Sequence, residues 1–303
     1  MRSIFQYLMV VTALLTSVTA NADDKGRLFI IGGATAYEWD LDKAQALLST
    51  SENPSVYTGT LYLKGGEDNT FKFLEATEWG GTEYGLPSDS ESANVSGNIQ
   101  LASGSLDDGY KQMYVENSGN YNLSVDVENK TAQIVYAEYQ ETEILYTSLF
   151  AVGGATPGNW SVNDGTPLYQ SASAPYEYKA NVKLKAAPES FKIATSLRGG
   201  GSFDAKYYFF RDGGDDGKIT TDSTDDRQWS VSEAGDYTIT VNTVSSTISV
   251  VKDTTTGIES ILVSKTDAGE TTYYNLQGQK VNTPSNGIFI QVSGNDVRKV
   301  ILH

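Results

Sequence analysis

Hydrophobic and polar residues alternate along most of the chain in short runs. The runs at residues 57–63, 121–127 and 237–241 place an apolar residue, an aromatic residue or glycine at every second position. Clusters of Gly, Asn and Asp separate these runs. Strict alternation between turn signals is typical of antiparallel strands with one buried face. The pattern therefore predicts an all-β protein.

Two copies of one unit make up most of the chain. Residues 28–35 read Leu-Phe-Ile-Ile-Gly-Gly-Ala-Thr, and residues 149–156 read Leu-Phe-Ala-Val-Gly-Gly-Ala-Thr, 121 positions later. Each copy has about 110 residues and about seven alternating runs, which is the size of an immunoglobulin-like β-sandwich. We therefore expect one such domain at 27–137 and a second at 148–252. A short, charged hinge at 138–148 joins them.

One stretch of the first copy has helical rather than alternating spacing. Apolar residues at positions 41, 44, 47 and 48 predict a helix over 41–49. The corresponding stretch of the second copy contains Gly165 and Pro167, which disfavour a helix. We therefore expect this helix to be an addition to the β framework.

Both ends of the chain lie outside the repeats. Residues 4–18 form an apolar run after Arg2, and Ala20-Asn21-Ala22 follows as a small-x-small cleavage pattern. This order is typical of a secretory signal peptide, which we place at 1–22 with cleavage after Ala22. At the other end, residues 258–303 contain three short apolar runs, which predict a small C-terminal β unit.

Composition and charge exclude several functions. The 38 acidic and 22 basic side chains give a formal charge of −16, which disfavours binding to nucleic acid or to an anionic membrane. The chain has no cysteine, and its single histidine is His303, the last residue. A disulfide, a thiolate nucleophile and a Ser-His-Asp site are therefore not expected. We expect no cofactor.

Two acidic features raise the possibility of a metal site or a glycosidase, and both signals are weak. Residues 212–217 read Asp-Gly-Gly-Asp-Asp-Gly and weakly resemble a calcium-binding loop. However, Gly214 stands where such a loop needs Asp or Asn, and Ser223 stands where it needs Glu. A solvated turn without a metal is the better interpretation. Glu75 and Glu78 have no acidic counterparts in the second copy, which disfavours a glycosidase built on paired carboxylates.

Loop tryptophans are the main candidates for ligand binding. Trp39 and Trp160 each follow a Gly-Gly-Ala-Thr turn, and Trp79 lies in another glycine-rich loop. A flat aromatic ring can cover the CH groups of a sugar while neighbouring polar groups bond its hydroxyls. Lys72 and Lys192 each follow a core Phe on the preceding strand, so we expect them to point opposite to it and outward.

The second copy changes part of this set. Where the first copy has Trp79, the second reads Arg198-Gly-Gly-Gly-Ser-Phe203, so that Phe203 is the nearest aromatic residue. The fourth tryptophan, Trp229, replaces Met113 in a matched strand, which predicts packing in the core.

The repeated motifs resemble the starch-binding outer-membrane proteins of the SusE/SusF type in Bacteroidetes. They comprise Gly-Gly-Ala-Thr followed by Trp, an alternating strand ending in Lys, Phe-Lys-Phe or Phe-Lys-Ile, and Gly-x-Tyr. Those proteins are strings of immunoglobulin-like domains that hold starch-type α-glucan at the cell surface without cleaving it. The resemblance implies a non-catalytic polysaccharide-binding protein that acts with outer-membrane glycan-uptake proteins.

The same resemblance implies a set of carbohydrate-binding residues. By position they are Trp39, Lys72 and Trp79 in the first copy, with Trp160, Lys192, Arg198 and Phe203 in the second. The chain departs from the family at its N-terminus, because lipoprotein members carry a Cys there and this chain has none.

The tail offers another route to the surface. Tyr-Asn-Leu-Gln-Gly-Gln-Lys-Val, Gly-Ile-Phe-Ile and a terminal Lys-Val-Ile-Leu resemble the C-terminal sorting domains of the type IX secretion pathway. This implies type IX machinery as a partner and a secreted protein at the cell surface or outer membrane of a Gram-negative bacterium. Two alternatives remain open: a third small structural domain in place of a sorting tail, and a structural or adhesive surface protein without a glycan site.

Overall fold

The computed structural model describes residues 26–104, 110–197, 207–222, 224–253, 271–275, 280–282, 285, 287–293 and 296–302. The chain divides into two compact units, Met1–Asp253 and Thr254–His303. In the described part of the chain, no helix has the length and apolar character needed to cross a membrane.

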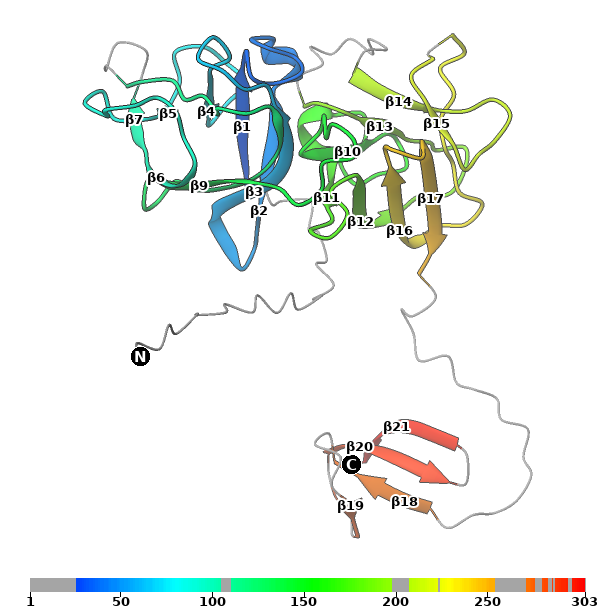
Figure 1. Ribbon diagram of the computed structural model, residues 1–303. Coiled ribbons are helices and arrows are strands. Elements are labelled where there is room, and N and C mark those ends of the chain that lie inside the picture. The colour runs from blue at the N-terminus through cyan, green and yellow to red at the C-terminus, as the bar shows by residue number, and fades with distance from the viewer. Residues whose placement is uncertain are drawn as a thin grey trace. The chain divides into compact units, whose positions relative to one another are not determined.

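A nine-stranded antiparallel sheet forms the first copy (Figure 1). Its order is β6-β9-β8-β3-β2-β1-β4-β5-β7. The strands are β1 (Arg27–Gly32), β2 (Gln45–Thr50), β3 (Asn53–Leu63), β4 (Phe71–Leu74), β5 (Glu83–Gly85), β6 (Gly97–Gln100), β7 (Ala102–Gly104), β8 (Gly119–Asp126) and β9 (Thr131–Tyr136). One buried cluster contains Phe73 of β4 and Ile134 of β9, which are far apart in this order. The sheet therefore curls around its core.

The second copy repeats this arrangement with eight strands. Their order is β15-β14-β13-β10-β11-β12-β16-β17. The strands are β10 (Ser148–Val152), β11 (Thr166–Gln170), β12 (Glu177–Leu184), β13 (Lys192–Ala194), β14 (Tyr208–Arg211), β15 (Ile219–Thr220), β16 (Gly235–Asn242) and β17 (Thr247–Lys252). The all-β prediction is confirmed, since the described helices are short 3-10 turns.

The predicted helix over 41–49 is wrong. Only Leu41–Lys43 forms a 3-10 turn, and the stretch from Gln45 onward belongs to strand β2. Both faces of β2 are covered, so its residues from Gln45 to Ser49 are all buried. A strand that is buried on both faces loses its alternation, and short apolar runs of this kind do not distinguish strand from helix.

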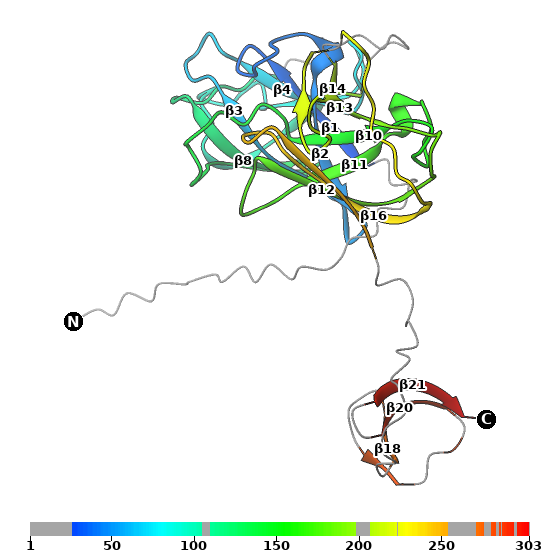
Figure 2. The ribbon, with the colours of Figure 1, turned by 90° about the vertical axis from the view of Figure 1, so that its right-hand side faces the viewer.

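The two copies pack against each other through a third core. This cluster joins outward-facing residues of β1 and β10, among them Phe29, Ile31, Phe150 and Val152. Figures 1 and 2 show strands of both copies side by side within one compact unit. Strands β1 and β10 are therefore buried on both faces, which explains their continuous apolar sequences.

The connector between the copies, predicted as a hinge at 138–148, is held by hydrogen bonds to the first copy. The side-chain amide of Asn120 donates to the backbone oxygens of Tyr139 and Thr142, each at 2.9 Å. Its Oδ1 accepts from the backbone nitrogen of Ile144 at 2.9 Å. One buried side chain on β8 thus holds the connector along its length.

The C-terminal unit contains a four-stranded antiparallel sheet, with order β19-β18-β20-β21. Its strands are β18 (Thr271–Tyr274), β19 (Lys280–Val281), β20 (Gly287–Ser293) and β21 (Asp296–Leu302). They lie at the runs from which a small β unit was predicted, with one strand more than the three expected.

Candidate functional site

Two exposed tryptophan rings lie side by side in the first copy. Trp39 comes from the loop between β1 and β2, and Trp79 from the loop between β4 and β5. Their ring centroids are 6.4 Å apart and their planes are tilted by 42°. Trp39 is 37% exposed and Trp79 is 49% exposed. Leaving this much aromatic surface in water forgoes the free energy of burial, so the pair is the candidate ligand platform.

The Gly-Gly-Ala-Thr motif builds the turn that carries Trp39. Thr35 Oγ1 donates to the backbone oxygen of Gly32 at 3.0 Å, and Gly32 N donates to the backbone oxygen of Glu38 at 3.0 Å. Gly32 has φ 148°, and a Cβ there would stand 2.2 Å from the backbone oxygen of Thr70. Only glycine fits this position, which explains why the motif has a glycine there.

The second copy forms the same turn at its own motif. Thr156 Oγ1 donates to the backbone oxygen of Gly153 at 2.9 Å, and Gly153 N donates to the backbone oxygen of Asn159 at 2.9 Å. The repeated sequence therefore forms the same turn before Trp160 as before Trp39.

Lys72 alternates with the core residues Phe71 and Phe73, but the prediction that it lies on an outward surface is wrong, because it is only 1% exposed. Its Nζ lies 2.5 Å from Glu83 Oε2 and 3.1 Å from the hydroxyl oxygen of Tyr110. The Nζ also lies 5.1 Å from the ring centroid of Trp79 and 5.9 Å from that of Trp39. The ammonium thus sits against both indole rings at cation–π range.

Glu83 completes a buried polar cluster behind the rings. This carboxylate on β5 is 0% exposed and also accepts a hydrogen bond from the Tyr110 hydroxyl. Burial and this hydrogen bond raise the pKa of Tyr110. Tyr110 therefore stays protonated and donates to Glu83 across the physiological pH range. Lys72, Glu83 and Tyr110 form what we call the support cluster.

In the second copy the equivalent lysine has a different setting. Lys192 is 1% exposed, so the outward prediction is wrong here too. Its Nζ lies 2.6 Å from Asp226 Oδ1, and the Asp226 side chain is 58% exposed. The Nζ also lies 5.6 Å from the Trp160 ring centroid, with Tyr208 and Phe210 at similar distances.

Trp160 belongs to the contact between the copies. Its ring is partly buried and packs against the third core, while Tyr208 and Phe210 are buried members of that core. Within the part of the second copy that the structure describes, no exposed aromatic ring accompanies the partly buried Trp160. The predicted residues Arg198 and Phe203 lie outside the described residues.

Sequence reasoning missed several partners of the two lysines. Glu83 lies on a strand of three residues, too short to show alternation, and Tyr110 belongs to no described strand. The run Tyr207-Tyr208-Phe209-Phe210 carries a signal, since four consecutive aromatic residues imply burial on both faces of a strand.

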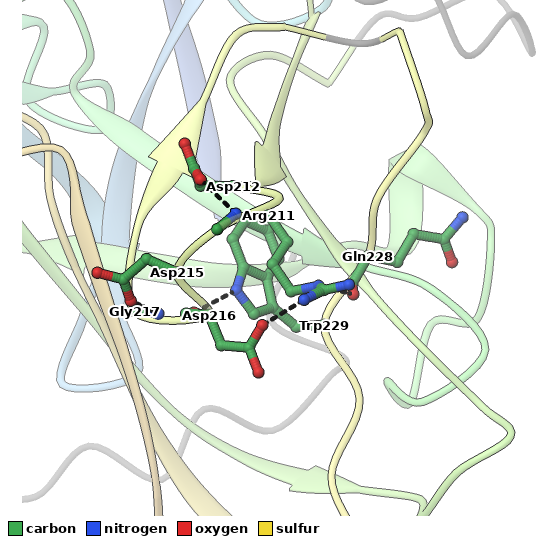
Figure 3. A network of polar contacts seen from close by, with 8 residues as sticks. Arg211, Asp212, Asp215, Asp216, Gly217, Gln228 and Trp229 are labelled. Carbon is green, nitrogen blue, oxygen red and sulfur yellow. Dashed lines mark hydrogen bonds and ion pairs between the residues drawn. The ribbon is translucent and has the colours of Figure 1, made fainter.

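The acidic loop at 212–217 is an ordered turn (Figure 3). Asp212 Oδ1 accepts from the backbone nitrogen of Gly214 at 2.8 Å, and Asp215 Oδ1 accepts from that of Gly217 at 2.8 Å. Side chains that bond the backbone two residues ahead are typical of Asx turns. The loop geometry therefore agrees with the turn interpretation.

Trp229 anchors this loop to the second core. Its ring is buried, as predicted, and its Nε1 donates to the backbone oxygen of Asp216 at 3.0 Å. Arg211 forms an ion pair with the Asp216 carboxylate and donates from Nε to the backbone oxygen of Gln228 at 3.0 Å (Figure 3). Trp229 is thus a structural residue, unlike the exposed Trp39 and Trp79.

Comparisons with known proteins show only distant likeness. No protein family matches the sequence, and no curated protein matches it. Among solved structures, SusF from Bacteroides thetaiotaomicron is similar, with 15% sequence identity and a TM-score of 0.28. The match covers 74% of this chain and 47% of that one, so the chain spans less than half of SusF. A likeness this weak establishes neither fold nor function, which have to be inferred from the geometry itself.

Proposed function

We infer that this protein binds a neutral polysaccharide without cleaving it, and that the Trp39–Trp79 pair is its main platform. The observation that carries this proposal is the exposure of two adjacent indole rings over a buried polar cluster. A tryptophan that served only as a structural plug would be covered by protein. Exposed rings instead offer their faces to the CH groups of sugar rings.

The support cluster makes the platform stiff. Lys72 lies within cation–π range of both rings, and its own position is held by Glu83 and Tyr110. Rings that are already held in their bound orientation lose less conformational entropy when a ligand arrives. Because Lys72 is buried, it acts here as a positioning residue, in contrast to the sugar-contacting basic residue that the resemblance implied.

The tilt of the platform favours a curved ligand. Two rings at 42° to each other present a bent surface. Successive residues of a helical α-glucan can follow such a surface, whereas a flat β-glucan ribbon fits coplanar rings better. This supports starch-type α-glucan as the ligand, in line with the family resemblance.

The second copy contributes less to binding in this proposal. Trp160 with Lys192, and with Arg198 and Phe203 as predicted neighbours, remains a candidate minor site. We place the protein at the surface of a Gram-negative bacterium, exported by the signal peptide at 1–22 and sorted by the tail at 258–303 through type IX machinery. Outer-membrane glycan-uptake proteins are its proposed partners there.

Retardation in native gels tests the proposal. The mature protein runs through gels that contain starch-type α-glucan, a β-glucan or a mannan, beside Trp79→Ala and Trp160→Ala. We expect retardation by the α-glucan and a loss of about tenfold in affinity in Trp79→Ala, from lost ring contact. Trp160→Ala is the matched control and keeps most of the affinity. Wild-type mobility that no glycan changes contradicts the proposal.

A further inference from the structure

The outer face of the first copy carries a row of uncharged polar side chains. Ser124 on β8 stands opposite Thr58 on β3 and opposite Gln133 on β9, and Gln133 stands opposite Asn98 on β6. Residues that pair directly across strands project to the same face of the sheet. The four side chains therefore form one row across four strands.

Two joined hollows follow this row. One has a volume of about 570 Å³ and is lined by residues of β3, β6, β8 and β9. The other, of about 310 Å³, reaches the junction with the second copy, where Tyr169 and Gln170 line it. Ser124 and Gln133 line both hollows, so they form one continuous groove.

The wall at the junction is fixed by hydrogen bonds between the copies. Gln170 Oε1 accepts from the backbone nitrogen of Thr60 at 2.6 Å, and Gln170 Nε2 donates to the backbone oxygen of Thr60 at 3.0 Å. Within the row, Gln133 Nε2 donates to Asn98 Oδ1 at 3.2 Å. The groove is therefore preformed rather than assembled on binding.

The groove is almost uncharged although the chain has a formal charge of −16. Asp126 is the only lining residue that is charged at neutral pH. Its Oδ1 accepts from the backbone nitrogens of Glu128 and Asn129, at 3.1 Å and 3.0 Å. The Asp126 carboxylate is thus hydrogen-bonded to the backbone of the turn between β8 and β9.

The duplicated face of the second copy provides an internal comparison. At the offset of 121 positions, Lys179 stands where the first copy has Thr58, and Lys183 where it has Tyr62. These lysines of β12 are exposed. At these two positions the sheet face therefore carries exposed lysines in the second copy and uncharged side chains in the first.

We propose that the groove over β3, β8, β9 and β6 is a second contact surface for a neutral polysaccharide. Amides and hydroxyls both donate and accept hydrogen bonds, as sugar hydroxyls do. A protein partner would favour a dense apolar and aromatic centre, and an anionic partner would favour basic side chains. The residues described as lining the groove include no basic side chain. The ligand class rests on the proposed function, while the surface is a new one.

Gln133→Glu tests the groove with little change in shape. The substitution adds a charge that a neutral ligand would desolvate, and it removes the donor amide. Ser249→Glu is the matched control, because it adds the same charge at the equivalent position of β17, 116 residues later. In the native gels, we expect Gln133→Glu to weaken binding of the retarding glycan about three- to tenfold. Ser249→Glu retains the wild-type affinity.

The same gels separate failure of the groove from failure of the platform. Equal retardation of Gln133→Glu and Ser249→Glu, with loss only in Trp79→Ala, overturns the groove and leaves the platform. Loss in Gln133→Glu but not in Trp79→Ala supports the groove and overturns the platform. Wild-type protein that no glycan retards overturns both. Thermal midpoints close to that of wild type show that the variants are folded.

Discussion

The two copies hold the same lysine in the same strand, yet they use it differently. In the first copy, Lys72 pairs with a carboxylate that is fully buried, and two exposed rings lie against it. In the second, Lys192 pairs with the exposed Asp226, and its rings are part of the contact between the copies. Duplication has thus preserved a local motif, while its surroundings differ: they hold an exposed pair of rings in the first copy and a packing contact in the second.

Removing the lysines gives the largest expected difference between the copies. Lys72→Met leaves the Glu83 carboxylate buried without its cation, so we expect a loss of about 3–5 kcal/mol in the free energy of unfolding. Lys192→Met leaves an exposed aspartate, so we expect about 1 kcal/mol or less. Urea unfolding measures both values.

A double variant shows whether the buried pair is the cause. Lys72→Met with Glu83→Met removes both charges, and we expect it to recover most of the stability lost in the single variant. A double variant as unstable as Lys72→Met would show that packing around the lysine stem, rather than an uncompensated charge, explains the loss.

Alanine at two adjacent glycines tests what the copies share. A Cβ on Gly32 would collide with backbone, whereas on Gly33 its nearest contact would be 3.6 Å away. We expect Gly32→Ala to cost about 2–3 kcal/mol and Gly33→Ala to stay within about 0.5 kcal/mol of wild type. Thermal unfolding compares the two, and equal midpoints would contradict the role given to the turn.

Tryptophan truncation separates the copies by stability as well as by binding. Trp160→Ala removes a ring that packs against the third core, so we expect a loss of about 2 kcal/mol. Trp79→Ala removes a ring that is half exposed and should cost about 1 kcal/mol or less. Urea unfolding of both variants is the measurement. A larger loss in Trp79→Ala would place Trp79 in the structural role.

Alkaline pH gives the smallest expected effect. The pKa of Tyr110 is raised by burial and by its bond to Glu83. Above pH about 10 the unfolded chain releases this proton while the folded chain keeps it, so stability falls as pH rises. We expect Tyr110→Phe to lose stability less steeply between pH about 9 and about 11. Slopes that match wild type would show that other tyrosines dominate.

The sequence predicts the strands and the duplication well because both depend on local pattern. Alternation shows that Lys72 faces away from Phe71 and Phe73, but it cannot show what covers that second face. The cover comes from loops, from Tyr110 and from the third core, which are remote in sequence. For the same reason β2 resembled a helix: its outer face is buried by the other copy.

The packing of the copies also sets how the two repeats are related to each other. Strands β1, β2 and β4 of the first copy meet the equivalent strands β10, β11 and β13 of the second. Each copy therefore packs against the other through the same face of its sheet. A contact between equivalent faces is closed once two copies have met, as in an isologous dimer. The two copies are therefore related within one chain as the two subunits of such a dimer are, with the third core as their interface.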